Sequence, residues 1–206
     1  MDEPLRTIEI TSISDDLFPA WLDLYETAFP ANERVLVSTF FRMLKDRAAG
    51  QAERCHFLAT MDGAGKLVGM AWYELHPAIQ AAVLWYIAVL PQARGQGMGS
   101  WLYRQVIACA DPAAYAAWVF EVERPEGAAS PEQEQLARRR IEFYRRNGAR
   151  LLTGIHYMQS VGAHQPPIPM HLMVHPLRQV DAQQAFTLAT GIFGGAVQMV
   201  GELALV

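Results

Sequence analysis

Three glycines occupy alternate positions in Arg94–Gly99, between an apolar segment and the start of an expected helix. Glycine lets the backbone approach a ligand closely and adopt positive φ. The N–H groups at a helix N-terminus favour an anion, and Arg94 adds a positive charge. The pattern predicts a phosphate or pyrophosphate site formed by Arg94, Gly95, Gln96, Gly97, Met98, Gly99 and Ser100.

Other phosphate motifs do not fit this segment. A Walker loop requires a lysine before its serine or threonine, and Gly99 precedes Ser100 here. A dinucleotide fingerprint requires G-x-G-x-x-G, but the sixth residue is Ser100 when counted from Gly95 and Leu102 when counted from Gly97. A glycine-rich turn without a ligand remains the alternative on this segment alone.

The periodicity of apolar residues predicts the elements that position this loop. Strands are expected over 7–14, 55–61, 67–75, 82–90, 117–123, 149–160 and 170–175. Helices are expected over 17–29, 35–46, 97–110 and 131–146, with a last helix that begins at Asp181. Early hairpins followed by one strand-helix-strand unit indicate an α+β fold, with a central mixed, mostly antiparallel sheet flanked by helices.

Composition limits the classes of partner and cofactor. The 206 residues are 51% hydrophobic and 18% charged, with a net charge of −4. An acidic balance argues against nucleic acid as a partner. The six histidines have no metal-ligand spacing, so no metal is expected. Cys55 and Cys109 lie in apolar runs and are expected to be buried free thiols, as in a cytoplasmic protein.

The C-terminal residues are unusually apolar. We expect one domain over residues 1–178 and an apolar C-terminal helix over residues 179–206. Glu202 is the only formal charge from Ala185 to Val206. Thr187, Gln198 and a glycine pair interrupt the run, which argues against a membrane span. A helix packed on the domain, or at the interface of a homodimer, is the expectation.

Two motifs resemble the GNAT acetyltransferase superfamily. The first is V-x-P-x-x-R-G-x-G-x-G, present as Val89 through Gly99. The second, Ile141 through Ala149, is similar to the family's F-Y-x-x-x-G-F segment, with Ala149 where an aromatic residue is usual. The resemblance covers roughly residues 7–175, and the expected order of elements agrees with the family's core. The fold class, the activity and the cofactor that follow are what this resemblance implies.

The resemblance implies that acetyl-CoA is the acyl donor. The amides of Arg94 to Gly99 would hold its pyrophosphate, and Val89 and Leu90 would pair with the pantetheine arm. The N–H near Ala88 or Val89 would polarise the thioester carbonyl. Tyr144 would protonate the departing thiolate; the alternative, which the motif disfavours, is a half-buried aromatic on an amphipathic helix.

An amine acceptor would attack the thioester directly. Because an amine is mostly protonated at neutral pH and only its neutral form attacks, a base is needed. Glu121 and Glu123 should share one face of the strand 117–123, about 7 Å apart, where each raises the other's pKa. Glu121 is the preferred base, and Glu123 would attract a cationic acceptor. The alternative is solvent exposure or pairing with arginines of the next helix. By the resemblance, Glu33 and Arg34 would lie in the acceptor region, and ordinary surface charge is the alternative for both.

The sequence thus predicts an N-acetyltransferase that acts on a primary amine of unknown identity, in the cytoplasm and without metal, nucleic acid or membrane. The alternative is a catalytically silent acyl-CoA-binding sensor or scaffold. A sensor could lose Tyr144 and the base, and this chain keeps candidates for both. A longer donor such as succinyl-CoA is also compatible, because the shape of the cleft sets acyl length.

Overall fold

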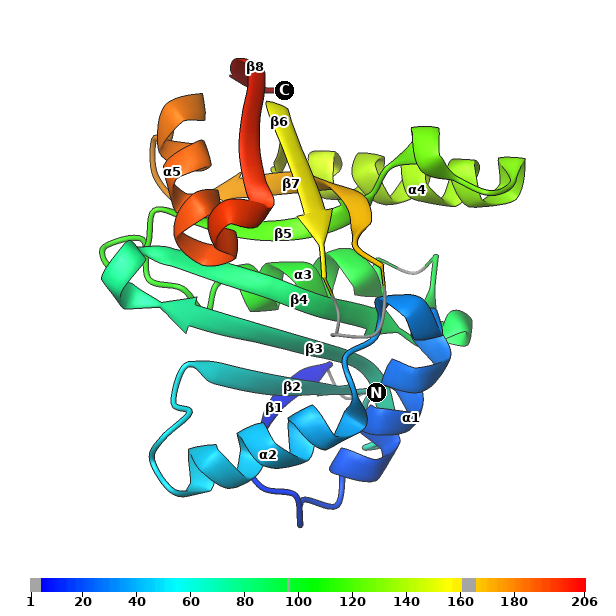
Figure 1. The fold of residues 1–206 in the computed structure, drawn as a ribbon. Coiled ribbons are helices and arrows are strands. Elements are labelled where there is room, and N and C mark those ends of the chain that lie inside the picture. Colours follow the sequence, from blue (N-terminus) through cyan, green and yellow to red (C-terminus); the bar gives the residue numbers. More distant parts are fainter. Residues whose placement is uncertain (1–4, 96, 161–165) are drawn as a thin grey trace. The chain divides into compact units, whose positions relative to one another are not determined.

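The computed structural model describes residues 5–95, 97–160 and 166–206 (Figure 1). The chain divides into two compact units. The first comprises the described residues up to Leu75 together with Leu84–Cys109, and the second comprises His76–Val83 and the described residues from Ala110 onward. Each unit combines strands with helices, as expected for the α+β class.

The first unit has strands in the order β1-β2-β3-β4. Its elements are β1 (Arg6–Ile10), α1 (Phe18–Ala28), α2 (Val37–Ala48), β2 (Cys55–Met61), β3 (Leu67–His76), β4 (Ala81–Val89) and α3 (Met98–Ile107). The last residue of β3 and the first three residues of β4 belong to the second unit. The pairs β1–β2 and β2–β3 are antiparallel.

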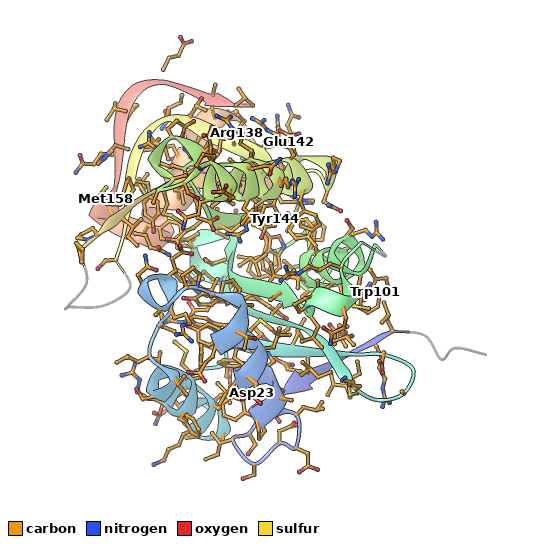
Figure 2. The ribbon with its side chains drawn as sticks, turned by 90° about the vertical axis from the view of Figure 1, so that its right-hand side faces the viewer. Asp23, Trp101, Arg138, Glu142, Tyr144 and Met158 are labelled. Carbon is orange, nitrogen blue, oxygen red and sulfur yellow. The ribbon has the colours of Figure 1, made fainter. Side chains whose placement is uncertain are left out.

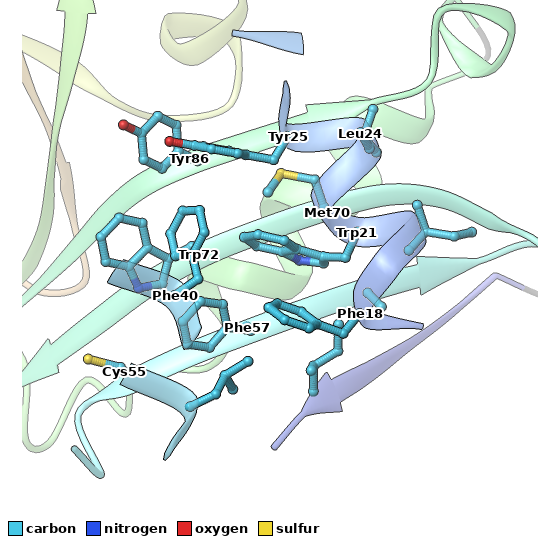
Figure 3. Packing of buried hydrophobic residues seen from close by; sticks show 14 residues of the cluster. Phe18, Trp21, Leu24, Tyr25, Phe40, Cys55, Phe57, Met70, Trp72 and Tyr86 are labelled. Carbon is cyan, nitrogen blue, oxygen red and sulfur yellow. The ribbon is translucent and has the colours of Figure 1, made fainter. Parts of the chain in front are cut away.

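Aromatic side chains form the core of the first unit (Figure 3). Trp21 on α1 and Phe40 on α2 are both fully buried and meet edge to face, with ring centroids 5.2 Å apart. Phe57 on β2 stacks on Trp72 of β3. The indole N–H of Trp21 donates to Leu58 O at 3.0 Å, so burial leaves that polar group satisfied. The two helices are thereby held against the strands that precede β4.

The second unit has strands in the order β5-β7-β6-β8, and their described pairings are antiparallel. Its elements are β5 (Ala117–Glu123), α4 (Pro131–Arg146), β6 (Arg150–Gln159), β7 (Ile168–Pro176), α5 (Ala182–Phe193) and β8 (Val197–Leu205). Ala185 and Ala189 of α5 cluster with Val119 of β5, whereas Tyr144 of α4 packs on Phe120. The two helices therefore lie on opposite faces of these strands.

The prediction of a C-terminal helix over residues 179–206 is wrong beyond Phe193, where α5 ends. Asp181 begins it with a capping box, as its side chain accepts Gln184 N at 2.7 Å. The helix stops where Gly194 takes φ +58, and the chain then forms β8 as a partner for β6. Residues 197–205 complete the backbone pairing of β6, which a helix could not do. Among the described helices none is long and apolar enough to cross a membrane.

Candidate functional site

The glycine loop opens directly into α3 in the first unit. Gly95 and Gly97 have φ of +82 and +77, and Gly97 is the N-cap of the helix. A Cβ added at either glycine would meet no described heavy atom within 4 Å. Both residues are exposed. The backbone thus has the conformation that requires glycine, and open space lies beside it, as a ligand cradle needs. Gln96 lies outside the described residues.

The first turn of α3 supplies the N–H groups. Trp101 N donates to Gly97 O at 2.9 Å, the first helical bond of this turn. The N–H groups of Met98, Gly99 and Ser100 precede that bond and belong to the positive end of the helix. The Arg94 N–H, by contrast, donates to Pro91 O at 3.2 Å. Its expected role as an amide donor needs correction, because the exposed guanidinium is the group that Arg94 can offer.

The direction of the backbone distinguishes the three residues at the end of β4. Leu90 N donates to Val68 O of β3 at 2.9 Å, so the backbone group that Leu90 could offer to pantetheine is its carbonyl. Successive residues of an extended chain point their N–H groups to opposite sides. Ala88 therefore shares the orientation of Leu90, and the N–H of Val89 points away from β3. Ala88 and Val89 were the two residues expected to donate an N–H to the thioester carbonyl. Of these, Val89 has an N–H that is not directed at β3.

Tyr144 lies on the side of α4 that packs against β5, whereas Arg138 and Glu142 project from its outer side (Figure 2). Its side chain is buried, and its ring centroid lies 4.6 Å from that of Phe120. Burial raises the pKa of the Tyr144 phenol, and the positive charge of Arg140 opposes this only in part. The phenol is therefore protonated at neutral pH, as a proton donor must be.

Glu121 and Glu123 have different partners. Glu121 Oε1 accepts a short hydrogen bond from Tyr157 Oη, and its Oε2 accepts Gln159 Nε2 at 2.6 Å. Glu123 forms an ion pair with Arg140 of α4. Glu121 therefore accepts hydrogen bonds from two neutral side chains, whereas Glu123 is paired with a charged one. For Glu123, the alternative of pairing with an arginine of the following helix is what the structure contains.

Two tyrosines hold the segment between α1 and α2, which contains Glu33 and Arg34. Tyr86 Oη donates to Glu33 O at 2.7 Å and accepts Val35 N at 3.2 Å. Tyr25 Oη donates to Val35 O at 3.0 Å. Arg34 donates to Glu26 O at 3.0 Å, so its side chain turns back onto α1.

The two cysteines differ in exposure. Cys55 is buried, and its thiol donates to Glu74 Oε1 at 3.2 Å. Burial, with the charge of Glu74, raises the pKa of Cys55 to about 12. Cys109 is exposed, so the expectation that both thiols are buried is wrong for it. No group of three potential metal ligands occurs within the described ranges, and His164 lies outside them.

The sequence-predicted site residues fall into two groups. The first unit contains the loop 94–100 and the end of β4, and the second contains Tyr144, Glu121 and Glu123. The sequence did not point to Tyr157 and Gln159 on β6. It also did not point to Tyr86, which lies within the apolar strand expected over 82–90. A glycine inside a strand can mark a bulge, so Gly154 was the available signal that β6 does not alternate simply.

Comparison with known proteins shows what part of this chain is similar to. Residues 52–148 match the profile described as "Acetyltransferase (GNAT) domain". No curated protein matched the chain. A Bacteroides thetaiotaomicron protein assigned to the GNAT acetyltransferases shares the fold, with a TM-score of 0.71 and 22% identity over 92% of this chain and 98% of that one.

Two further structures share the fold. A GNAT family acetyltransferase from Elizabethkingia anophelis, solved with acetyl-CoA bound, has a TM-score of 0.54 and 13% identity over 84% of this chain and 97% of that one. The ribosomal-protein-S18-alanine N-acetyltransferase from Escherichia coli has a TM-score of 0.52 and 20% identity over 85% and 96%. The profile match covers residues 52–148, and these three structures share the fold over most of the chain.

Proposed function

We propose that this protein transfers the acetyl group of acetyl-CoA to a primary amine by direct attack in a ternary complex. The observation that carries the proposal is the loop before α3. There, two glycines with positive φ face open space beside the N–H groups of a helix N-terminus. This arrangement fits an anionic diphosphate, because a side chain at either glycine would occupy the space beside the donors.

Acetyl-CoA, when bound, supplies a thioester whose carbonyl carbon the amine can attack. The N–H groups of Met98, Gly99 and Ser100 would hold the pyrophosphate, with the Arg94 guanidinium beside it. The Val89 N–H, which points away from β3, would donate to the carbonyl oxygen and stabilise the negative charge that develops there. Gly97 is the residue whose substitution should disturb this binding most directly.

Two proton transfers complete the reaction. The amine nitrogen bonds to the carbonyl carbon and gives up a proton to Glu121, directly or through water. The C–S bond then breaks, and the sulfur receives the proton of the Tyr144 hydroxyl. Burial raises the pKa of Tyr144, so its hydroxyl keeps the proton at neutral pH and has it to give to a thiolate. The two hydrogen bonds from Tyr157 and Gln159 are compatible with proton uptake, because an ionised carboxylate has about four lone-pair sites.

The test is a thiol-release screen with acetyl-CoA against a panel of amines that includes small metabolites, peptide N-termini and lysine peptides. Acceptor-dependent release of CoA, with the acetylated product seen by mass spectrometry, supports the proposal. Saturable CoA binding without transfer to any amine would favour a silent acyl-CoA-binding module instead. A parallel screen with succinyl-CoA separates acetyl transfer from transfer of a longer acyl group.

The role of Glu121 is tested with the acceptor found in that screen. Glu121→Gln should lose the acidic limb of the kcat/KM profile, with activity recovering only at high pH, where the amine is already neutral. Glu123→Gln is the matched control, because its carboxylate forms an ion pair with Arg140 instead. A profile unchanged in Glu121→Gln would remove this residue from the mechanism.

A further inference from the structure

We infer that Tyr157 and Gln159 are positioning residues for the Glu121 carboxylate, and that the C-terminal segment, residues 182–206, holds Tyr157 on it. The contribution to catalysis rests on the proposed role of Glu121 as the base. The contacts of Tyr157 and Gln159 with Glu121 do not depend on that role, because they lie within the second unit and can be tested without an acceptor.

Both oxygens of Glu121 receive a donor from the same strand. Tyr157 Oη bonds to Oε1, and Gln159 Nε2 bonds to Oε2 at 2.6 Å. The two residues are separated by one position on β6, so their side chains leave the strand on the same face. Two donors on two oxygens fix the plane of the carboxylate, which a single contact would leave free to rotate.

An irregularity in β6 places these donors on that face. Between the pairs Leu152–Leu172 and Met158–Pro169, β6 advances six residues while β7 advances three. β6 thus has three extra residues. Because this number is odd, side chains beyond the irregularity point to the opposite face from the one that regular alternation would give. Leu152 and Tyr157 are an odd number of positions apart, yet both belong to the core cluster beneath α5. With regular pairing, Tyr157 and Gln159 would point away from Glu121.

Gly154 makes the irregularity possible. Its φ is +78, and a Cβ there would lie 2.2 Å from Glu202 O of β8. Only glycine combines this conformation with such a close approach of backbone. The backbone of β8 thus packs directly against the irregular part of β6, and the conformation that directs Tyr157 toward Glu121 depends on both strands.

The C-terminal segment also encloses the Tyr157 ring. Val197 of β8 pairs with Tyr157, and the ring of Phe193, at the end of α5, lies 5.0 Å from the Tyr157 ring. Val206 pairs with the start of β6: Val206 N donates to Leu151 O at 3.0 Å, and Leu151 N donates to Val206 O at 2.7 Å. The segment therefore restrains the side chain that holds the carboxylate.

Ionisable residues near Glu121 along β5 and β7 have charged partners of their own. On β5, Glu123 is paired with Arg140 of α4, and on β7 His171 Nε2 lies 3.4 Å from Glu126. Helix α5 has no ionisable residue. On β6, Tyr157 is the titratable donor, and burial together with the charge of Glu121 raises its pKa. Because hydrogen bonds to a carboxylate favour its charged form, removal of a donor should move the titration of Glu121 to higher pH.

The first experiment follows Glu121 directly. Its side-chain carboxyl carbon is titrated by ¹³C NMR, with the signal assigned by its loss in Glu121→Gln. Tyr157→Phe keeps the ring and removes the hydroxyl, and Gln159→Leu removes the amide. Each should move the midpoint upward, whereas Met199→Thr, an exposed position on β8, should leave it in place. A midpoint unchanged in both donor variants would overturn the inference.

The second experiment uses turnover with a verified amine. Tyr157→Phe should lower kcat by about ten- to a hundredfold, the factor for loss of a hydrogen bond to a charged group, and should move the acidic limb upward with KM for acetyl-CoA unchanged. If the NMR midpoint moves and the rate profile does not, the contacts are real but Glu121 is not the base, and the inference about positioning for catalysis fails with that role.

The C-terminal part is tested at Phe193. Phe193→Leu, which keeps most of the bulk, and Phe193→Ala should move the Glu121 midpoint in the same direction as Tyr157→Phe. Neither should move it further when the Tyr157 hydroxyl is already absent, because both act through that hydroxyl. Full additivity in either double variant, or no effect of Phe193→Leu and Phe193→Ala in folded protein, would overturn the role of the segment.

Discussion

Tyr86 on β4 donates its hydroxyl hydrogen to the backbone carbonyl of Glu33 at 2.7 Å. The same oxygen accepts the Val35 N–H at 3.2 Å. One side chain on the strand that ends at Val89 thus holds the backbone on both sides of Arg34. This contact connects the expected acceptor segment to β4, the strand that ends at the proposed carbonyl donor Val89.

Tyr86→Phe should loosen this segment and leave the core intact, because the ring contacts with Tyr25 and Phe29 remain. The Val35 amide should exchange with solvent faster, and stability should fall by about 1 kcal/mol, as for loss of a hydrogen bond. Hydrogen exchange and thermal unfolding measure both. Tyr25→Phe is the matched control, since it removes a bond to Val35 O and not to its N–H. Unchanged exchange at Val35 in Tyr86→Phe would contradict the contact.

Gly97→Glu should weaken CoA binding by about tenfold or more, because the side chain would put bulk and negative charge beside the helix donors. Gly97→Ala separates the charge from the cost of a side chain at φ +77. Gly65→Glu is a matched control, since Gly65 also has φ +77 and open space but lies in the β2–β3 turn. Calorimetry with CoA gives the affinities. Equal binding by wild type and Gly97→Glu would refute the pyrophosphate assignment.

Tyr144→Phe should lower turnover by about 10²–10⁴-fold, the usual contribution of general acid catalysis. Affinity for CoA should stay nearly constant, because the ring and its contact with Phe120 are kept. Tyr115→Phe, in the segment before β5, provides the comparison. Steady-state kinetics with a verified amine measure the effect. A turnover equal to that of wild type would limit Tyr144 to packing.

Glu9 should contribute to stability only above acidic pH. Burial raises its pKa, but hydrogen bonds from His56 and Arg47 and their charges outweigh burial and lower the pKa below 4.5. A carboxylate with a lowered pKa in the folded state stabilises the fold above its unfolded pKa and loses this effect as pH falls through the folded value.

Glu9→Gln should therefore be less stable than wild type at pH 7, by about 1 kcal/mol or less because Glu9 is partly exposed. The two proteins should converge as the pH falls through the lowered pKa of Glu9 in the folded state. Urea unfolding at several pH values tests this. A difference that persists at low pH would assign the effect to packing rather than to charge.

The thiols should react in a fixed order. Cys55 is buried and its pKa is raised to about 12, so it stays a protonated thiol near pH 8. Cys109 is exposed, although desolvation raises its pKa as well. A thiol reagent at pH 8 should therefore modify one site in native protein, slowly, and two after denaturation. Cys109→Ser should leave none in the native state. Rapid labelling of Cys55 would contradict its burial.

The sequence alone predicted the elements that depend on local pattern. The strands 55–61 and 117–123 and the helix 131–146 match the structure, because alternation, apolar spacing and caps are local properties. The spacing of Arg94, Gly95, Gly97 and Gly99 also predicted the resemblance that the profile match over residues 52–148 repeats, since positive φ and a helix N-terminus are recognisable from a few residues.

Tertiary structure decided which groups face one another. Glu121 and Glu123 are equivalent by alternation, but one meets Tyr157 and Gln159 and the other meets Arg140. The choice depends on three extra residues in β6, on Gly154 and on a C-terminal strand that the sequence presented as a helix. Pairing between segments that are distant in the chain sets these contacts, and no local periodicity encodes which strand will complete an edge.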